Sequence, residues 1–382
     1  MHANSKIKIF VLVGEESGEN IAYSIINELS KKANIELHGL GGSKLKSLGL
    51  KPLYNFHELS IMGIIEVIPK IPRILYLINK TVKSINRIKP NLIVSVDSPD
   101  FNFRVLKKIK NNSPYLKTLH IVAPSVWAWK PNRAKKISKF IDNLFVLFPF
   151  ERKYFLPHGI NTKYIGHPLL ENLIKEVSNT KKTISFNKKV ISIFPGSRKK
   201  EILKHLKTIL FFIANNPLKK KFKFIIIAVD VYMSLIEDII KGNHIGLNIK
   251  VLRSSSFKNY AFRYSDYAIA VSGTITLELA INRIPTIVVY RLNFLSYFIL
   301  KRLVLVKYIS LVNIILNKQV FPELIQKNFT LENFNKEFNK LILNSNYKNK
   351  QIKMLDKLYV LLITNRNKSK STAIEAILKI LS

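Results

Sequence analysis

An aspartate closes a short apolar run in the first half of the chain. Residues 92–96 are followed by Asp97, Ser98, Pro99 and Asp100. Ligands of open parallel sheets bind beyond the carboxyl ends of the strands, where Asp97 is expected to lie. A partly desolvated carboxylate can act there as a general base. We therefore predict a catalytic role for Asp97 and an N-cap role for Asp100, which precedes a helical stretch.

A glycine-rich turn follows the apolar run at residues 7–13. Its polar and small residues are Gly14, Glu15, Ser17 and Gly18, ahead of a helical stretch. Glycine allows a tight turn, and the helix start exposes free N–H groups. The dinucleotide pattern G-x-G-x-x-G is absent, and carboxylates disfavour phosphate, so these residues suit sugar hydroxyls. A structural turn with Ser17 as helix cap is the alternative.

The second half opens with a turn suited to a diphosphate. Gly196, Ser197 and Arg198 follow the apolar run at residues 190–194 and precede a helix. Backbone N–H groups, a hydroxyl and a guanidinium there would converge on one anion. The Walker pattern is missing, which argues against ATP hydrolysis. A solvated basic helix start is the alternative.

A similar turn, Gly273 and Thr274, follows the apolar run at residues 267–271. Glu278 lies one helical turn further and can accept hydrogen bonds from two ribose hydroxyls. This spacing predicts a nucleotide-sugar site in the second half. The alternative is a buried glutamate, which would need a partner of its own.

Both tryptophans, Trp127 and Trp129, follow the apolar run at residues 118–122. They are expected either to wall an acceptor site or to pack in the core. His167 stands alone near the expected crossing between the two halves. It has no second histidine or carboxylate at metal-ligand spacing, so we predict neither a bound metal nor a cofactor.

The segment 60–78 is unusually apolar, yet it carries Glu66, Lys70 and Arg73. An apolar face with a basic rim suits insertion into a membrane surface, whereas a core helix with a loop is the alternative. The side chains expected to enter the membrane are Val67, Ile68, Ile71, Ile74 and Leu75.

Short apolar runs alternate with helical-period segments in both halves. The runs show little alternation, which is typical of parallel strands covered on both faces. We therefore predict an α/β fold with two Rossmann-like, doubly wound parallel-sheet domains facing a cleft. Strands are expected at residues 7–13, 35–40, 92–96, 118–122, 144–147, 190–194, 224–228, 249–252, 267–271 and 286–290. Helices are expected at 20–31, 73–88, 103–110, 132–140, 150–156, 200–215, 233–241, 257–264, 274–282 and 295–303, and throughout 331–381.

The length of 382 residues predicts two domains. We expect the first at residues 1–170, joined by a C-terminal helix at 366–382. The second is expected at 186–365, after a polar linker.

The chain is strongly basic, with 62 Lys and Arg against 24 Asp and Glu and a formal net charge of +38. Such a charge attracts polyanions such as anionic lipid, phosphorylated substrates or nucleic acid. The Lys and Asn are spread along the whole chain rather than clustered, which favours compositional drift over a nucleic-acid footprint. There is no cysteine, so disulfides are excluded. No apolar run reaches the ~18–20 residues of a spanning helix, so any membrane contact is expected to be interfacial.

Taken together, these motifs resemble the lipid-A-disaccharide synthase family over nearly the whole chain. The stretch 124–129, Pro-Ser-Val-Trp-Ala-Trp, and the order of the motifs are specific, whereas any single glycine-rich turn is not. The resemblance also rests on Gly14-Glu15 with Ser17-Gly18, Met62-Gly63-Ile64, Glu66-Val67, Asp97, Pro99 to Asn102, Phe148 to Glu151, Ile165-Gly166-His167, Pro195 to Arg198, Ser272-Gly273-Thr274, Glu278, Tyr290-Arg291, Lys301-Arg302-Leu303, Ser310-Leu311 and Asn313.

The resemblance implies a GT-B glycosyltransferase of lipid A synthesis. Its donor would be UDP-2,3-diacylglucosamine, its acceptor 2,3-diacylglucosamine 1-phosphate, and its products a β-1,6-linked disaccharide 1-phosphate and UDP. The family acts in the cytoplasm, on the inner-membrane face of Gram-negative-type bacteria. A homodimer is compatible with the resemblance. The predicted roles are catalytic base for Asp97, catalytic stabilisation of the leaving diphosphate for Arg198, and nucleotide orientation for Glu278 and Asn313.

Two other classes of function stay open. One is a different UDP-sugar enzyme of the GT-B type, such as a UDP-GlcNAc 2-epimerase or a lipid-linked sugar transferase. The other is a basic nucleic-acid-binding protein, which predicts steeply salt-dependent binding. We find no recognition motif for nucleic acid in the sequence, so we expect none as a partner.

Overall fold

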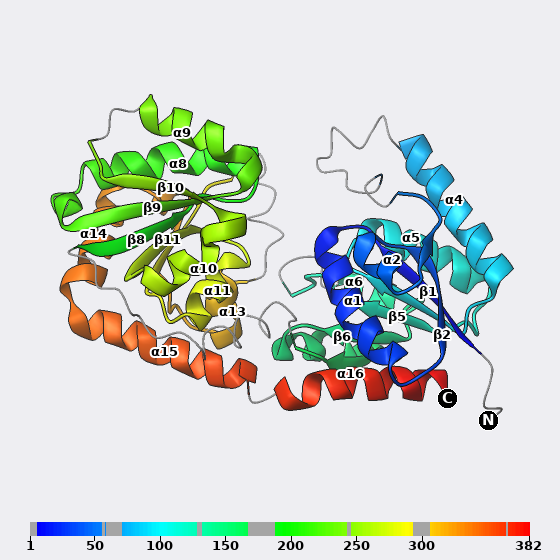
Figure 1. Ribbon diagram of the computed structural model, residues 1–382. Helices are drawn as coiled ribbons and strands as arrows, with labels where there is room; N and C mark the ends of the chain where they lie inside the picture. The colour runs from blue at the N-terminus through cyan, green and yellow to red at the C-terminus, as the bar shows by residue number, and fades with distance from the viewer. Residues whose placement is uncertain are drawn as a thin grey trace. The chain divides into compact units, whose positions relative to one another are not determined.

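The computed structural model describes residues 6–55, 58, 71–127, 132–166, 188–242, 246–292, 306–363 and 366–382. The chain divides into two compact units. The first unit contains residues 1–168 and 365–382, and the second contains residues 169–364. Each unit has one parallel sheet with helices packed on it, so the predicted α/β fold class is confirmed (Figure 1).

The sheet of the first unit has the strand order β3-β2-β1-β4-β5-β6-β7 within the described residues. Every neighbouring pair is parallel. The order runs outward from β1 in both directions, which is the doubly wound arrangement. The strands are β1 Ile7–Val13, β2 Ile35–Leu40, β3 Lys51–Pro52, β4 Leu92–Val96, β5 Thr118–Ile121, β6 Asn143–Val146 and β7 Asn161–Tyr164.

Helices connect these strands, and a helix from the far end of the sequence joins them. The helix α16, drawn in red in Figure 1, packs against α1 of the first unit. Ala373, Ile374 and Ile377 of α16 are buried. The helices are α1 Glu16–Ser30, α2 Ser43–Ser47, α4 Ile71–Ile88, α5 Pro99–Asn112, α6 Asn132–Ile137 and α16 Arg366–Leu381, with 3₁₀ turns at Pro149–Tyr154 and Leu156–His158.

The sheet of the second unit repeats this arrangement, with the order β10-β9-β8-β11-β12-β13 and parallel pairs throughout. The strands are β8 Lys189–Phe194, β9 Phe222–Ala228, β10 Ile249–Arg253, β11 Tyr267–Val271, β12 Thr286–Tyr290 and β13 Glu323–Ile325. The helices are α8 Lys199–Ala214, α9 Met233–Lys241, α10 Ser254–Tyr264, α11 Ile275–Ile281, α13 Leu311–Leu316, α14 Leu331–Leu343 and α15 Ser345–Ile363.

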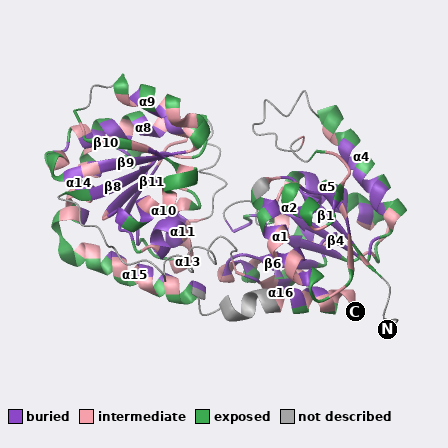
Figure 2. Ribbon diagram, in the orientation of Figure 1, coloured by how far each residue is buried: buried purple, intermediate pink, exposed green. Residues whose placement is uncertain are grey.

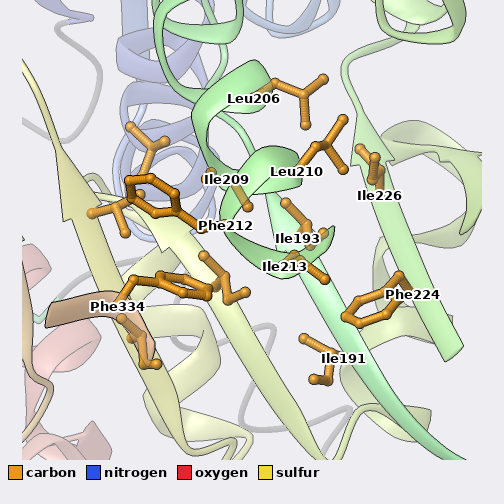
Figure 3. Packing of buried hydrophobic residues seen from close by; sticks show 14 of the residues in the cluster. Ile191, Ile193, Leu206, Ile209, Leu210, Phe212, Ile213, Phe224, Ile226 and Phe334 are labelled. Carbon is orange, nitrogen blue, oxygen red and sulfur yellow. The ribbon is translucent and has the colours of Figure 1, made fainter. Parts of the chain in front are cut away.

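The core of the second unit shows why the strands are apolar throughout. Leu206, Ile209, Leu210 and Ile213 recur on one face of α8 at helical spacing, and all four are fully buried. They pack over β8 and β9, as Figure 3 shows, against Ile191, Ile193 and Ile226. Both faces of the sheet are covered by helices, so its inner strands are buried almost without interruption (Figure 2).

The structure corrects several predicted boundaries. The helix predicted at residues 103–110 begins at Pro99, and the one predicted at 20–31 begins at Glu16. The segment 150–156 forms 3₁₀ turns rather than an α-helix. The helix predicted at 295–303 lies outside the described residues. Among the helices that the structure describes, none is long and apolar enough to cross a membrane.

Candidate active site

The same topological feature marks the candidate ligand site of each sheet. β1 pairs with both β2 and β4, and β8 pairs with both β9 and β11, so the strand order reverses at β1 and at β8. Open parallel sheets bind ligands at such a switch point, beyond the carboxyl ends of the strands. In each sheet, predicted site residues follow the two strands that meet there: Gly14 and Asp97 in the first, Gly196 and Gly273 in the second.

In the first unit, the glycine turn after β1 lies against the end of β4. A Cβ atom built on Gly18 would lie 3.4 Å from the carbonyl oxygen of Val96 and 3.6 Å from Cβ of Asp97. The structure therefore brings two predicted site segments into contact. The helix α1 begins at Glu16, which places Ser17 inside its first turn and exposed. The alternative of Ser17 as the helix cap is therefore wrong.

Asp97 stands at the sharp turn between β4 and α5. Asp97 and Ser98 have φ angles of +52° and +43°, in the left-handed region that costs energy for residues other than glycine. The turn is held by a hydrogen bond from Asp97 N–H to the carbonyl of Ile121, and by one from the Asn102 amide to the carbonyl of Asp97. Strained turns with this much support occur at functional sites.

Burial of the Asp97 side chain raises the pKa of its carboxyl above the ordinary value, and a hydrogen bond from the N–H of Ser98 opposes this shift. A carboxylate with a raised pKa is a better proton acceptor than an ordinary aspartate. The position and the pKa of Asp97 are both suited to a general base.

The predicted N-cap role of Asp100 is wrong. Ser98 is the N-cap and Pro99 the first helical residue, so Asp100 lies in the first turn of α5. The Asp100 side chain is 97% exposed and lies 3.5 Å from Arg133. A carboxylate in the first helical turn still interacts favourably with the helix dipole.

Trp127 is packed rather than exposed. Its side chain is buried, its ring meets Phe150 edge-on at 5.4 Å, and its indole N–H donates to Glu151 Oε1 at 3.3 Å. Glu151 Oε2 also accepts hydrogen bonds from the N–H groups of Leu147 and Phe148. This geometry favours the core-packing interpretation of Trp127, in a segment that follows β5 at the same edge of the sheet as Asp97.

The carboxyl of Glu151 was part of a recognised motif, but its role was not predicted. Burial raises the pKa of Glu151 to about 7, although its three donors, the N–H of Phe148, the Trp127 indole and the N–H of Leu147, each lower it. Glu151 therefore changes charge near neutral pH. The separation of Glu151 and Trp127 in the sequence does not predict that their side chains are in contact.

In the second unit, the two predicted turns line one cavity of about 350 Å³. Five of the six predicted nucleotide-sugar residues contribute to its wall, together with the predicted catalytic Arg198. The predicted residues that line the cavity are Gly196, Ser197, Arg198, Gly273, Thr274 and Glu278. Glu201 and Lys258, which were not predicted, line it as well.

The turn at Gly196 needs glycine. Its φ is +113°, and a Cβ atom there would lie 2.7 Å from Cβ of Glu201. The Glu201 carboxylate accepts a hydrogen bond from the N–H of Ser197 at 3.1 Å and lies 3.4 Å from Nη1 of Arg198. Two of the predicted donors, the N–H of Ser197 and the guanidinium of Arg198, thus meet at the carboxylate of Glu201. Arg198 remains 63% exposed and accessible to a ligand.

Glu278 is buried and has a partner that the sequence did not reveal. Its Oε2 forms an ion pair with Nζ of Lys258, which projects from α10. The alternative interpretation, a buried structural glutamate, requires such a partner, and Lys258 provides it. Because Lys258 also lines the cavity, the pair does not exclude a ligand-binding role for Glu278.

Asn313 lies outside this cavity, at the start of α13. Its Nδ2 donates to Phe321 O and Glu323 Oε1, and its Oδ1 accepts from the N–H groups of Val320 and Phe321. The Asn313 side chain is fully buried, and these contacts use both of its donors and both acceptor positions. Any effect of Asn313 on a nucleotide would therefore act through the segments that it holds.

The helix α4 carries the described part of the predicted membrane segment. Ile71 and Leu75 are 42% and 43% exposed, whereas Ile74 packs against the core. The exposed face of α4 also carries Arg73, Lys80, Lys83 and Arg87. Val67 and Ile68 lie outside the described residues, as do Trp129 and His167. Within the described part of the chain, no cluster of three His, Asp or Glu side chains could hold a metal ion.

The fold matches those of solved structures along nearly the whole chain. A UDP-GlcNAc 2-epimerase from Neisseria meningitidis, solved with UDP-GlcNAc, superposes with a TM-score of 0.62 at 16% identity over 98% of this chain and 100% of that one. MurG from Acinetobacter baumannii superposes with a TM-score of 0.58 at 14% identity over 98% and 100% of the two chains. Fold and switch-point turns together define the GT-B class.

A family model described as Lipid-A-disaccharide synthetase matches residues 9–377. The lipid-A-disaccharide synthase of Rickettsia prowazekii is 36% identical over 378 residues, which cover 97% of this chain and 98% of the relative. That of Rickettsia typhi is 37% identical, covering 92% and 94%. The chain belongs to the lipid-A-disaccharide synthase family.

Proposed function

We propose that this glycosyltransferase joins UDP-2,3-diacylglucosamine to 2,3-diacylglucosamine 1-phosphate, giving the β-1,6-linked disaccharide 1-phosphate and UDP. One observation carries the proposal beyond family membership. A carboxylate and a cation-bearing turn occupy equivalent switch points, Asp97 in one Rossmann-like unit and Gly196–Arg198 in the other. The two chemical tasks of glycosyl transfer, activating a hydroxyl and holding a diphosphate, call for these groups.

The reaction is a single displacement with inversion. Asp97 takes the proton from the 6-hydroxyl of the acceptor, while that oxygen forms a bond to the anomeric carbon of the donor. The bond between the anomeric carbon and the β-phosphate oxygen breaks, and UDP leaves with the electron pair. The raised pKa of Asp97 strengthens it as the base.

The second unit stabilises the leaving group. Negative charge builds up on the diphosphate in the transition state, so fixed positive potential there lowers the barrier. Arg198, the N–H groups at Gly196–Ser197 and the turn at Gly273–Thr274 supply this potential. Glu278 accepts hydrogen bonds from the ribose hydroxyls. Asn313 acts indirectly, by holding the backbone at residues 320–321.

The first unit, with residues 366–382, takes the acceptor and faces the membrane, and the second unit takes the donor. Gly18 lies beside Asp97, and the turn to which it belongs, with Gly14, Glu15 and Ser17, binds the acceptor sugar. Ile71 and Leu75 contact the anionic inner-membrane surface on its cytoplasmic side, whereas Ile74 packs against the core. Each buried CH₂ of the acyl chains contributes about 0.8 kcal/mol, which favours reaction at the bilayer.

Incubation of the protein with both acylated sugars, followed by mass analysis, tests this function. The expected products are a disaccharide 1-phosphate and UDP in equal amounts. A parallel reaction with UDP-GlcNAc alone tests the rival epimerase activity. Epimerised UDP-GlcNAc without disaccharide from the acylated pair would refute the proposal.

A further inference from the structure

The cavity of the second unit holds two ion pairs, each between a cation and a carboxylate. Arg198 pairs with Glu201 beside the first turn, and Lys258 pairs with Glu278 beside the second. All four side chains line the same space of about 350 Å³. Among the described charged residues of this wall, the charges therefore cancel.

A balanced cavity is poorly suited to its proposed ligand. The diphosphate of a nucleotide sugar carries two negative charges, and Glu278 and Glu201 would repel it. The two cations contact it most strongly if they turn from their carboxylate partners toward the ligand. A lysine can do this, because its ammonium is a compact charge on a flexible stem with three rotatable donors.

Lys258 has the position and the freedom for such a change of partner. Its side chain is 34% exposed, whereas that of Glu278 is 9% exposed. The Lys258 ammonium lies 5.8 Å from the ring centroid of Phe262 on the same helix. The lysine can thus move at its exposed end, whereas the carboxylate on α11 is almost fully buried.

We propose that Lys258 is a further ligand of the donor diphosphate, and that it pairs with Glu278 only while the cavity holds no nucleotide. When the nucleotide sugar enters, the Lys258 ammonium exchanges the carboxylate for a phosphate oxygen. The Glu278 carboxylate is then released to accept the ribose hydroxyls. This inference rests on the proposed function and adds a binding residue and an exchange of partners to it.

A structural role for the same ion pair has a different consequence. If Lys258 only neutralised Glu278, its removal would disturb the ribose site. The affinities for uridine and for UDP would then fall by the same factor. If Lys258 contacts the diphosphate, its removal weakens the binding of UDP. The binding of uridine, which lacks phosphate, then stays nearly unchanged. The ratio of the two affinities therefore separates the roles.

The experiment is calorimetric titration of the full chain with UDP and with uridine. For Lys258→Met we expect the Kd for UDP to rise about tenfold or more, as for loss of a charge-assisted hydrogen bond, with the Kd for uridine changing less than about threefold. Lys250→Met, an exposed lysine on β10, is the matched control and should leave both constants unchanged.

A second variant guards against the effect of an unpaired buried carboxylate. Lys258→Met combined with Glu278→Gln removes both charges, and it should still bind UDP about tenfold less tightly than Glu278→Gln alone. Equal UDP affinity in these two variants, or equal losses for UDP and uridine in Lys258→Met, would overturn the role of Lys258. Wild-type protein that fails to bind UDP would overturn the donor site as a whole.

Discussion

The side-chain amide of Asn102 donates a hydrogen bond to the main-chain carbonyl of Asp97 across 2.7 Å. Asn102 is buried in the first turns of α5, and its Nδ2 also lies 3.4 Å from the carbonyl of Val96. This amide ties the helix to the end of β4 and holds the left-handed turn that presents the proposed base.

Replacement of Asn102 by alanine should therefore affect both stability and rate. We expect Asn102→Ala to lower the free energy of unfolding by about 1–3 kcal/mol, because it leaves buried carbonyls without their donor. Turnover should fall about ten- to a hundredfold, because the base is no longer held in place. Urea unfolding and initial rates measure the two effects. Asn112→Ala, exposed at the other end of α5, should change neither, and wild-type turnover in Asn102→Ala would contradict the positioning role.

Replacement of Asp97 by asparagine should abolish most turnover without unfolding the protein. Asparagine tolerates positive φ, so the turn is preserved, while the loss of a general base costs about 10²–10⁴ in rate. In the wild type, protonation of Asp97 inactivates the base as pH falls. Because burial raises its pKa, the acid limb of kcat/KM should lie above the ordinary pKa of 3.8 for aspartate. Near-normal rates in Asp97→Asn, with a wild-type melting temperature, would remove Asp97 from the mechanism.

Replacement of Arg198 by alanine should impair chemistry but not folding. The Arg198 side chain is largely exposed, so its ion pair with Glu201 contributes little to stability. Loss of one donor to the developing charge typically costs about 10²–10³ in kcat, and we expect a loss of this size. Steady-state kinetics with both acylated sugars measure it. The neighbouring exposed Lys200 gives a matched control, and Lys200→Ala with an equal loss would point to general charge rather than to a specific contact.

The buried carboxyl of Glu151 should give stability a measurable pH dependence. Its pKa is raised from 4.5 to about 7 in the folded protein, so between these values the folded state keeps a proton that the unfolded state releases. The contribution of Glu151 to stability is therefore present at low pH and is lost as pH rises through about 7. Relative to Glu151→Gln, the wild type should lose on the order of 2 kcal/mol between pH 5 and pH 8.

Urea unfolding of both proteins at the two pH values measures this difference. Glu332→Gln, which removes an exposed carboxyl on α14, serves as the control. Its free energy of unfolding should change between the two pH values as that of the wild type does. A constant stability difference between wild type and Glu151→Gln at both pH values would show that Glu151 does not titrate in this range.

The exposed apolar side chains of α4 should support binding to bilayers. We expect Ile71→Ser combined with Leu75→Ser to weaken binding to anionic vesicles about tenfold or more, because less apolar area enters the membrane. Binding of UDP should not change. Phe211→Ser on α8 is the control, since Phe211 is 57% exposed in the other unit. Unchanged flotation with vesicles would refute the membrane role of α4.

The sequence predicted the buried strands best. Strands β1, β2, β4, β11 and β12 have the predicted bounds, because strands covered on both faces are continuous apolar runs that end at polar turns. The edge strands β3, β7 and β13 were missed. They have only two to four residues, such as Lys51–Pro52, and their pairing depends on a neighbour already being in place.

The candidate site was predictable where it depends on topology and not where it depends on side-chain packing. Asp97 and Gly196 follow buried strands, so their place at the carboxyl edge follows from the parallel sheet. Lys258 lies on a different helix from Glu278, and only the packing of α10 beside the cavity brings them together. The start of α5 at Pro99 was missed because a serine in the left-handed region, Ser98, caps it.

The packing of α16 on α1 has a consequence for biosynthesis. Residues 366–381 complete the first unit, but the ribosome makes them after the whole second unit. The second unit is continuous in sequence and can fold as soon as it emerges. Until α16 has been synthesised, the side of α1 that it covers stays exposed and accessible to chaperones. The unit that is synthesised first therefore completes its folding last.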